Sequence, residues 1–387
     1  MTTATMNPIG FTLTEEQKQL QETARKFAAD VMRPVAAHHD HTEEFPDKVL
    51  RKAHELGLMN LIIAEEHGGL GLSGVDGCIV TEELAWGCAG MATSLMANDL
   101  AISPIVLDAS EEQKREWLPK FGDYRLASFC LSEPGAGSDV AGMSTHARRD
   151  GDHYILNGAK QWITNATYAD QLTVFATVDK TQRHKSLVAL IVDAKTPGIT
   201  IGKPEDKMGQ RASNTAPVIF EDVKVPVANR IGEEGQGWQV AMRTLDKSRP
   251  MVAALCVGLA RAAMEHAIEY ANERKQFGQP IANFQGIQFL IANMGMKTQA
   301  SRLLTWQAAW ALDAGLRNTL YSSYAKSFAA DTCMEVTTDA VQVFGGYGYT
   351  KEYPVEKLMR DAKLMQIYEG TAQVQRMVIA RELLKGA

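Results

Sequence analysis

The chain has 387 residues, of which 45% are hydrophobic and 22% charged, and this composition predicts a globular protein of two or three domains. A formal net charge of −6, without a Lys/Arg-rich run, disfavours binding to DNA or RNA. The apolar run Leu187–Val192 is far too short to span a membrane, and the N-terminus lacks the charged and apolar regions of a secretory signal. Five scattered cysteines and nine histidines without metal-binding spacing predict reduced thiols in a cytoplasmic protein, with no metal site.

Residues 1–125 form the first predicted block, an N-terminal helical domain. Thr14 and Gln17 have the spacing of a capping box, and apolar residues follow at helical intervals. Ser110 and Gln113 repeat this signal before a second helix. The glycine-rich stretch at residues 68–74 lacks the G-K-[ST] of a phosphate loop, so we expect a connection between helices there.

The pattern changes to short β-rich runs in residues 126–235, which predict a middle β domain. Asn157–Gly158 and Pro197–Gly198 are predicted turns between such runs. Because no helical pattern intervenes, an antiparallel sheet or barrel is favoured over a doubly wound sheet. The β-rich runs are His153–Leu156, Leu172–Thr177, Leu187–Val192 and Val218–Phe220.

Helical patterns return in residues 236–387 and continue to the end of the chain. Four long stretches, at residues 238–275, 285–313, 316–343 and 353–385, predict a C-terminal four-helix bundle domain. The expected fold class is therefore mainly α with a central β domain.

Glu369 is the most informative single residue, because it lies between an aromatic ring and a glycine in a run with apolar neighbours. Partial burial there raises the pKa of a carboxyl group, which makes the carboxylate a usable base near neutral pH. A glutamate that only charges a helix end explains this segment equally well.

The stretch Phe129–Asp139 has small side chains and a tight loop whose backbone N–H groups suit the close approach of a ligand. It is not a dinucleotide fingerprint, because Val140 stands where the third glycine of that motif is required. A plain turn and a ligand-binding loop both remain open for this stretch alone.

Together with Gln161–Asn165, Arg274–Gly278 and Ile367–Gln373, this loop makes the chain resemble the acyl-CoA dehydrogenases, from about Leu13 to Leu384. It is most similar to the medium- and short-chain members. The resemblance implies the three-domain fold of that family, FAD as cofactor, and a homotetramer. It also implies dehydrogenation of acyl-CoA to trans-2-enoyl-CoA in fatty acid β-oxidation, with hydride transfer to flavin N5. Electrons then pass to an electron-transferring flavoprotein, in a bacterial cytoplasm or a mitochondrial matrix.

The resemblance assigns the proton-abstracting role to Glu369. Some family members carry this base on an earlier helix, and Ser248, which cannot serve as the base, stands at the corresponding position. In the family, the cofactor residues of the 274–346 region contact the adenosine-diphosphate end of a neighbouring subunit's flavin. The implied FAD-binding residues are Phe129, Leu131, Ser132, Ser138, Trp162, Ile163, Thr164, Arg274, Phe277, Gln285, Gln342, Gly345, Gly346, Thr371 and Gln373. The implied substrate-binding residues are Ser138, Asp246, Arg249, Met96, Leu100, Tyr368 and Gly370.

Each of these positions also has a purely structural interpretation. Trp162 could be a core tryptophan, Arg274 a solvated cation at a helix end, and the glycines after Val343 a helix stop. The charges between Asp246 and Arg249 could form an exposed cluster at a helix start.

The length of the acyl chain in the substrate is predicted only from the helix that carries Met96. A flexible apolar side chain suits acyl chains of varied length, so we favour medium-chain substrates, with short or branched chains next. The other functions considered are an acyl-CoA oxidase, a non-enzymatic flavin-binding relative, and a changed reaction on the same scaffold.

Overall fold

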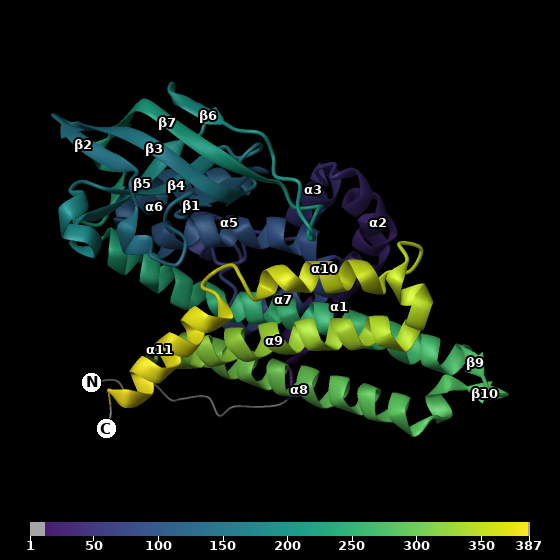
Figure 1. Ribbon diagram of the computed structural model, residues 1–387. Helices are drawn as coiled ribbons and strands as arrows, with labels where there is room; N and C mark the ends of the chain where they lie inside the picture. The colour runs from purple at the N-terminus through teal and green to yellow at the C-terminus, as the bar shows by residue number, and fades with distance from the viewer. Residues whose placement is uncertain (1–11, 386–387) are drawn as a thin grey trace.

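The computed structural model describes residues 12–385, in which helices are followed by a sheet and then by helices again (Figure 1). Both predicted capping boxes are present: the Thr14 hydroxyl accepts a hydrogen bond from the Gln17 N–H, and the Ser110 hydroxyl accepts one from the Gln113 N–H. The helices of this first part are α1 (Glu15–Phe27), α2 (Arg33–Thr42), α3 (Asp47–Glu55), α4 (Gly74–Gly87), α5 (Ala89–Asp108) and α6 (Glu111–Trp117).

The middle of the chain forms an eight-stranded sheet that is open, with β6 and β8 at the ends of the strand order β6-β7-β3-β2-β4-β5-β8. The expected sheet is therefore present, but it is not a closed barrel. Most neighbours are antiparallel, whereas β1 and β2 each pair with β4 in parallel. The strands are β1 (Ala127–Cys130), β2 (His146–Asp150), β3 (His153–Thr164), β4 (Gln171–Thr177), β5 (Leu187–Asp193), β6 (Ile199–Ile201), β7 (Thr215–Pro226) and β8 (Arg230–Ile231).

The predicted turn at Asn157–Gly158 is wrong, because both residues lie inside β3 at a shift in its register with β7. Gly158 has a φ of 144°, and a Cβ there would lie 2.6 Å from the Cα of Thr145. The glycine therefore permits close approach of two strands, which local sequence reading cannot distinguish from a turn. The turn at Pro197–Gly198 is confirmed.

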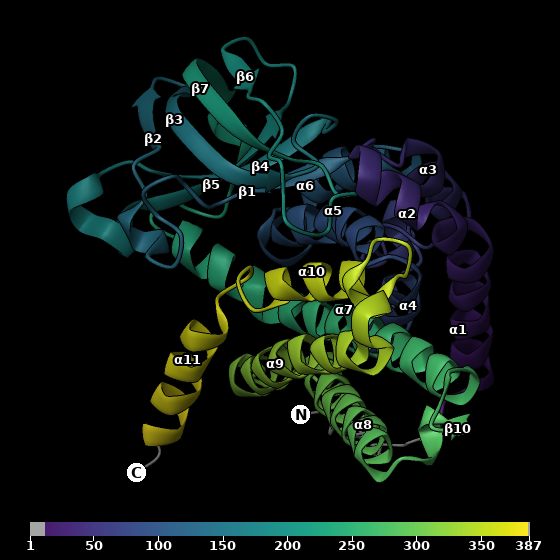
Figure 2. The same cartoon turned by 45° about the vertical axis from the view of Figure 1, so that its right-hand side comes forward.

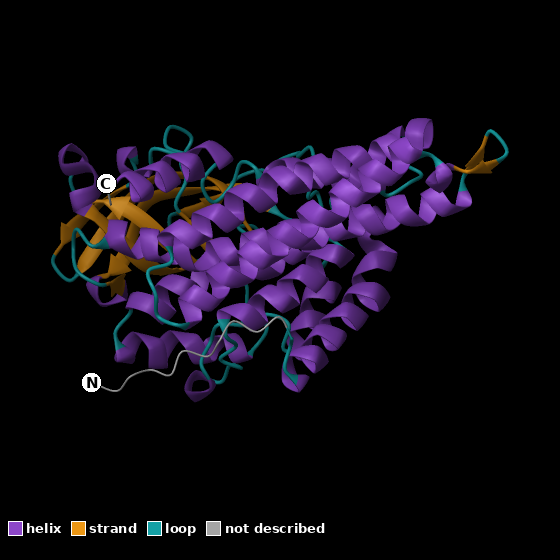
Figure 3. Cartoon of the chain, turned by 90° about the horizontal axis from the view of Figure 1, so that it is seen from below, coloured by secondary structure: helices purple, strands orange, loops and turns teal. Residues whose placement is uncertain are grey.

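The last part contains three long helices that pack side by side and two shorter ones, with a small hairpin of β9 (Lys275–Gln276) and β10 (Gln279–Pro280) projecting from one end (Figure 3). One helix was expected at residues 353–385, and this is wrong. The chain breaks between α10 and α11, because Glu369 and Gly370 both adopt left-handed backbone angles, with φ of 52° and 89°. The helices are α7 (Gly237–Glu273), α8 (Gln285–Asp313), α9 (Thr319–Phe344), α10 (Val355–Met365) and α11 (Ala372–Leu384).

The N-terminal and C-terminal helices share one hydrophobic core, in which buried residues of α1, α4 and α5 pack against those of α7, α9 and α10. Helix α7 extends from beneath the sheet to the hairpin and so connects all parts of the molecule (Figure 2). In the described part, α5 and α7 are long and apolar enough to cross a membrane, but 78% and 72% of their most apolar windows are buried inside the protein. Core helices pass the same test, so the absence of a membrane span stays a prediction.

A buried ion pair fixes the loop after β1. The Lys160 ammonium group donates to Glu133 Oε1 at 2.8 Å, and the Thr145 N–H donates to the same carboxylate oxygen at 2.9 Å. Burial opposes ionisation of Glu133, but the Lys160 charge and these hydrogen bonds outweigh it and lower the pKa of Glu133 to about 2. The loop that contains the predicted flavin contacts is therefore anchored to β3.

We expect Glu133→Gln to destabilise the protein by about 3–5 kcal/mol, because it leaves the buried Lys160 charge without its partner. Urea unfolding followed by circular dichroism measures this loss. Asp139→Asn is the matched control, because it removes only an exposed ion pair to Arg183 at 2.6 Å and should hardly move the midpoint. Equal midpoints for wild type and Glu133→Gln would contradict the anchoring role.

Candidate active site

Glu369 lies in the turn between α10 and α11, at the point where the sequence suggested a base. Its backbone is left-handed, which directs the half-buried side chain away from the helix path. Thr371 caps the start of α11, because its hydroxyl accepts a hydrogen bond from the Val374 N–H at 3.1 Å. A non-glycine residue in this conformation is uncommon, and such residues gather at functional sites. The turn therefore presents one carboxylate in a defined direction.

The carboxylate of Glu369 faces α7. The Ser248 hydroxyl donates to Glu369 Oε2 at 2.5 Å, and the cationic groups of Arg249 and Lys326 lie nearby. Burial raises the pKa of Glu369, while the Ser248 hydrogen bond and the two cations partly oppose this rise. Ser248 thus lies opposite Glu369 in space, as expected if positions 248 and 369 are the two alternative places for a base in the family.

The predicted acyl-binding residues lie on α5 and beside Glu369. The Tyr368 hydroxyl donates to the Met365 sulfur at 3.0 Å, and burial raises the pKa of this hydroxyl. Met96 is half-buried, and its sulfur accepts a hydrogen bond from Thr81 at 3.1 Å. Leu100, one turn further along α5, is also half-buried. Met96 and Tyr368 both pack against one hydrophobic core, which also contains buried residues of α7.

The last residues of β3 and the segment that begins in β1 and continues to Ser138 carry the first group of predicted flavin residues and lie side by side. The Gln161 N–H donates to the Ser132 carbonyl at 2.9 Å, and the Ser128 hydroxyl donates to the Thr164 carbonyl at 2.7 Å. Asn165, directly after β3, donates to the Ser94 carbonyl at 2.8 Å and so connects the end of β3 to α5. These contacts join the end of β3 to the helix that carries the predicted acyl-binding residues Met96 and Leu100.

Trp162 is not a core tryptophan, because 61% of its surface is exposed and its φ is 63° at an irregularity in β3. Leu131 and Ile163 are buried, so only their backbone groups could face a ligand. Phe129 packs against Phe175 with ring centres 5.0 Å apart. Among the other predicted contacts, Ser138 and Gln373 are exposed, whereas Ser132, Thr164, Thr371 and Gly370 are partly exposed.

A second group of predicted flavin residues lies at the far end of the bundle. Phe277, in the hairpin, is 92% exposed, and Arg274 lies 5.4 Å from the ring centre of Tyr347. The helical rise of about 1.5 Å per residue separates Gln342 from Lys326, beside the Glu369 turn, by roughly 24 Å along α9. One chain therefore does not bring the two groups together. The second group comprises Arg274, Phe277, Gln285, Gln342, Gly345 and Gly346.

The glycines after Val343 do end a helix, since α9 stops at Phe344 with Gly345 as its cap. A Cβ at Gly345 or Gly346 would meet no atom within 4 Å, so their backbone is also open to a ligand.

The Asp246–Arg249 segment is not an exposed cluster at a helix start, because it lies inside α7 and Arg249 is only 5% exposed. Arg249 donates to Asp246 Oδ1 at 2.6 Å, and Thr319 donates to the other carboxylate oxygen at 2.6 Å. The Nε atom of Arg249 is buried without a hydrogen-bond partner. This unsatisfied donor fits a position that receives a polar ligand.

Sequence reasoning missed two residues that hold the Glu369 turn. Lys326 donates to the Gly370 carbonyl at 2.7 Å, and Gln375 donates to the Gly370 and Glu369 carbonyls at 3.2 and 3.3 Å. Both side chains are fully buried. Lys326 lies among small residues of a helix, and nothing in its neighbouring sequence predicts a contact with Gly370, which is 44 residues further along the chain.

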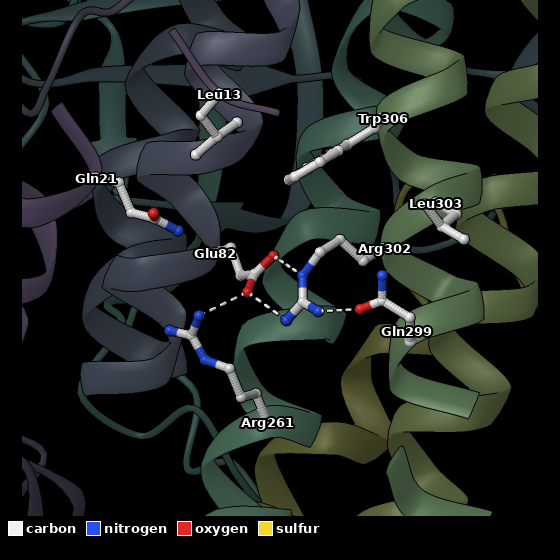
Figure 4. Close-up of a pocket in the computed structure, with 8 residues that line it drawn as sticks. All are labelled: Leu13, Gln21, Glu82, Arg261, Gln299, Arg302, Leu303 and Trp306. Carbon is white, nitrogen blue, oxygen red and sulfur yellow. Dashed lines mark hydrogen bonds and ion pairs between the residues drawn. The ribbon is translucent and has the colours of Figure 1, made fainter. Parts of the chain in front are cut away.

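Two cavities lie away from these residues. One of about 370 Å³ opens between α1, α4, α7 and α8, where Glu82 pairs with Arg261 and Arg302 and Trp306 lies at the rim (Figure 4). The other, of about 240 Å³, lies near Trp117 and Gln171. A group capable of binding a metal, Glu66, His67 and Glu111, is also remote in sequence from the predicted site.

Comparison with known proteins identifies the family. Models of the acyl-CoA dehydrogenase N-terminal, middle and C-terminal domains match residues 14–124, 128–223 and 235–384. A probable acyl-CoA dehydrogenase of Bacillus subtilis is 45% identical over 380 residues, which cover 97% of this chain and 100% of the relative. The short-chain specific acyl-CoA dehydrogenase of Clostridium acetobutylicum is 42% identical over 377 residues, again 97% and 100% of the two chains.

Solved structures agree with these matches. The butyryl-CoA dehydrogenase of Megasphaera elsdenii has a TM-score of 0.95 and 41% identity, with 97% of this chain and 100% of that chain covered. The chain thus belongs to the acyl-CoA dehydrogenase family and is an oxidoreductase of that family. The predicted family and fold class are confirmed.

We expect Ser248→Ala to raise the pKa of Glu369 further, because the lost hydrogen bond stabilises the charged form. The carboxylate would then be available only at higher pH, so the acid limb of kcat/KM should move upward by about one pH unit. A pH profile measured from pH 5 to 9 tests this, with Ser327→Ala on α9 as control. An unmoved acid limb would contradict the assigned contact.

Proposed function

We propose that this protein dehydrogenates acyl-CoA thioesters between Cα and Cβ, with Glu369 removing the α-proton and FAD as the cofactor. The observation that carries the proposal is the single half-buried carboxylate of Glu369, presented by a left-handed turn against Ser248. A Cα–H beside a thioester is a weak acid, so its removal requires a placed base.

The described residues fit a flat aromatic cofactor. Trp162 lies in β3 with 61% of its surface exposed, and the Gln161 N–H beside it donates to the Ser132 carbonyl, which brings the segment after β1 close to it. Phe277 and the open glycines at the far end of the bundle fit contacts with a second copy's cofactor. When bound, FAD accepts the hydride that leaves Cβ, and the product is trans-2-enoyl-CoA.

The chain's own residues bind and orient the substrate in this proposal. Glu369 accepts the α-proton, and its backbone N–H polarises the thioester carbonyl. Arg249 and Asp246 contact the CoA portion, while Tyr368 and the α5 surface around Met96 enclose the acyl chain and exclude water. Gly370 allows the turn to pass close to the thioester.

Partner and assembly follow by analogy with relatives. A chain 42% identical to this one, with a TM-score of 0.95, occurs in a structure of the electron transferring flavoprotein of Acidaminococcus fermentans. We infer that such a flavoprotein accepts the electrons here and that the protein works as a homotetramer. Bacterial and mitochondrial relatives both exist, and a cytoplasmic or matrix location fits either case.

We expect Glu369→Gln to retain FAD but to lose turnover by about three orders of magnitude or more, because the amide cannot accept the proton. Dye-linked turnover with octanoyl-CoA measures the loss, and the visible spectrum reports bound flavin. Glu352→Gln, an exposed position before α10, is the control. Near-normal turnover of Glu369→Gln would remove this residue from the mechanism.

Medium-chain acyl-CoA is the proposed substrate, since flexible Met96 and Met251 both contact Thr81 at the predicted acyl surface and can adapt to different chains. A series of saturated acyl-CoA substrates from four to sixteen carbons should give the highest kcat/KM near eight carbons. The highest value at four carbons would instead assign a short-chain enzyme.

A further inference from the structure

The turn that presents Glu369 is an unfavourable backbone arrangement that other residues must hold. Two successive residues have positive φ, and only the second is a glycine. Its carbonyl groups point into the protein, where Gln375 and Lys326 donate to them. The direction of the Glu369 side chain therefore depends on donors outside the turn.

Lys326 is the unusual donor of the two. It lies on α9, is fully buried, and donates to the Gly370 carbonyl at 2.7 Å. Within residues 12–385 its ammonium group makes no ion pair, although burying a charge without a paired carboxylate is costly. Burial lowers the pKa of Lys326 to about 8, so the group still carries most of its charge at neutral pH. A neutral side chain could donate the same hydrogen bond to the Gly370 carbonyl. The positive charge of Lys326 therefore suggests a second role besides this hydrogen bond.

That charge acts on Glu369. The Lys326 ammonium and the Glu369 carboxylate interact electrostatically in the same enclosed region, and the cation favours the ionised carboxylate against the effect of burial. Arg249 acts in the same direction from α7. The charged and titratable groups around the turn are Asp246, Arg249 and Cys256 on α7, Lys326 and Asp331 on α9, Tyr368 in the turn, and Arg376 and Arg381 on α11.

We propose that Lys326 is a positioning residue for the dehydrogenation: its hydrogen bond to the Gly370 carbonyl fixes the Glu369–Gly370 turn, and its charge favours the ionised form of the Glu369 carboxylate. This inference rests on the proposed function, because it assumes that Glu369 is the base. A lysine with a merely structural role would support the fold without affecting the ionisation of Glu369.

The test compares variants that separate the charge from the hydrogen bond. Lys326→Met removes both the charge and the hydrogen bond at nearly the same side-chain length, whereas Gln375→Leu removes a neutral donor to the Gly370 and Glu369 carbonyls and no charge. We expect Lys326→Met to keep FAD, to lose about 10- to 100-fold in kcat, and to move the acid limb of kcat/KM upward by about one pH unit. Gln375→Leu should lower kcat without moving the acid limb.

Wild-type kcat and an unmoved acid limb in Lys326→Met would overturn the proposal, as would an equal shift of the acid limb in Gln375→Leu. If Lys326→Met does not fold, Lys326→Gln, which keeps a donor but no charge, should still show the shifted limb. Glu369→Gln assayed in parallel distinguishes a failure of the Lys326 proposal from a failure of the proposed function. Its inactivity together with a wild-type Lys326→Met refutes only the role of Lys326, whereas its full activity refutes the proposed function itself.

Discussion

The left-handed turn at Glu369 and Gly370 is the constraint on which the candidate site depends. It interrupts what would otherwise be one C-terminal helix and directs a carboxylate towards α7 instead of solvent. Such a backbone persists only where surrounding contacts determine it, and here buried Lys326 and Gln375 supply them. The same burial that stabilises the turn raises the proton affinity of the carboxylate, so conformation and chemistry have one cause.

The rest of the fold surrounds this turn. Helix α7 places Ser248 and Arg249 near the carboxylate, and α5 contacts the segment between β6 and β7 through Thr93, whose hydroxyl donates to the Gln210 side chain at 2.8 Å. Asp361 on α10 accepts a hydrogen bond from the Gln210 N–H and so fastens the sheet domain to the helix that leads into the turn. Three segments far apart in sequence thus meet at one point because each is held by buried polar contacts.

The features that could be predicted from the sequence are those that depend on residues close together in the chain. Capping boxes, the β-rich middle and the long helices follow from local spacing, and they are present. The break before α11 and the bulge at Gly158 were missed, because a glycine in a helical or strand pattern does not reveal which close contact it permits. Arg249 was predicted to bind substrate, with exposed charge as the alternative, and its burial could not be predicted; Lys326 gave no signal, because burial of both depends on tertiary packing. The neighbours of Glu369 and the family resemblance together predict it as a base, and its role stays a prediction.

The central claim is that one enclosed carboxylate and a flavin act together on an acyl-CoA thioester. Its most direct test is an anaerobic titration of the purified protein with octanoyl-CoA, followed in the visible spectrum. The account predicts a yellow protein whose oxidised-flavin band disappears as the substrate is added, with octenoyl-CoA recovered from the mixture. A protein that contains no flavin and takes up none, or a band that persists at saturating octanoyl-CoA and at the other acyl lengths, would contradict it.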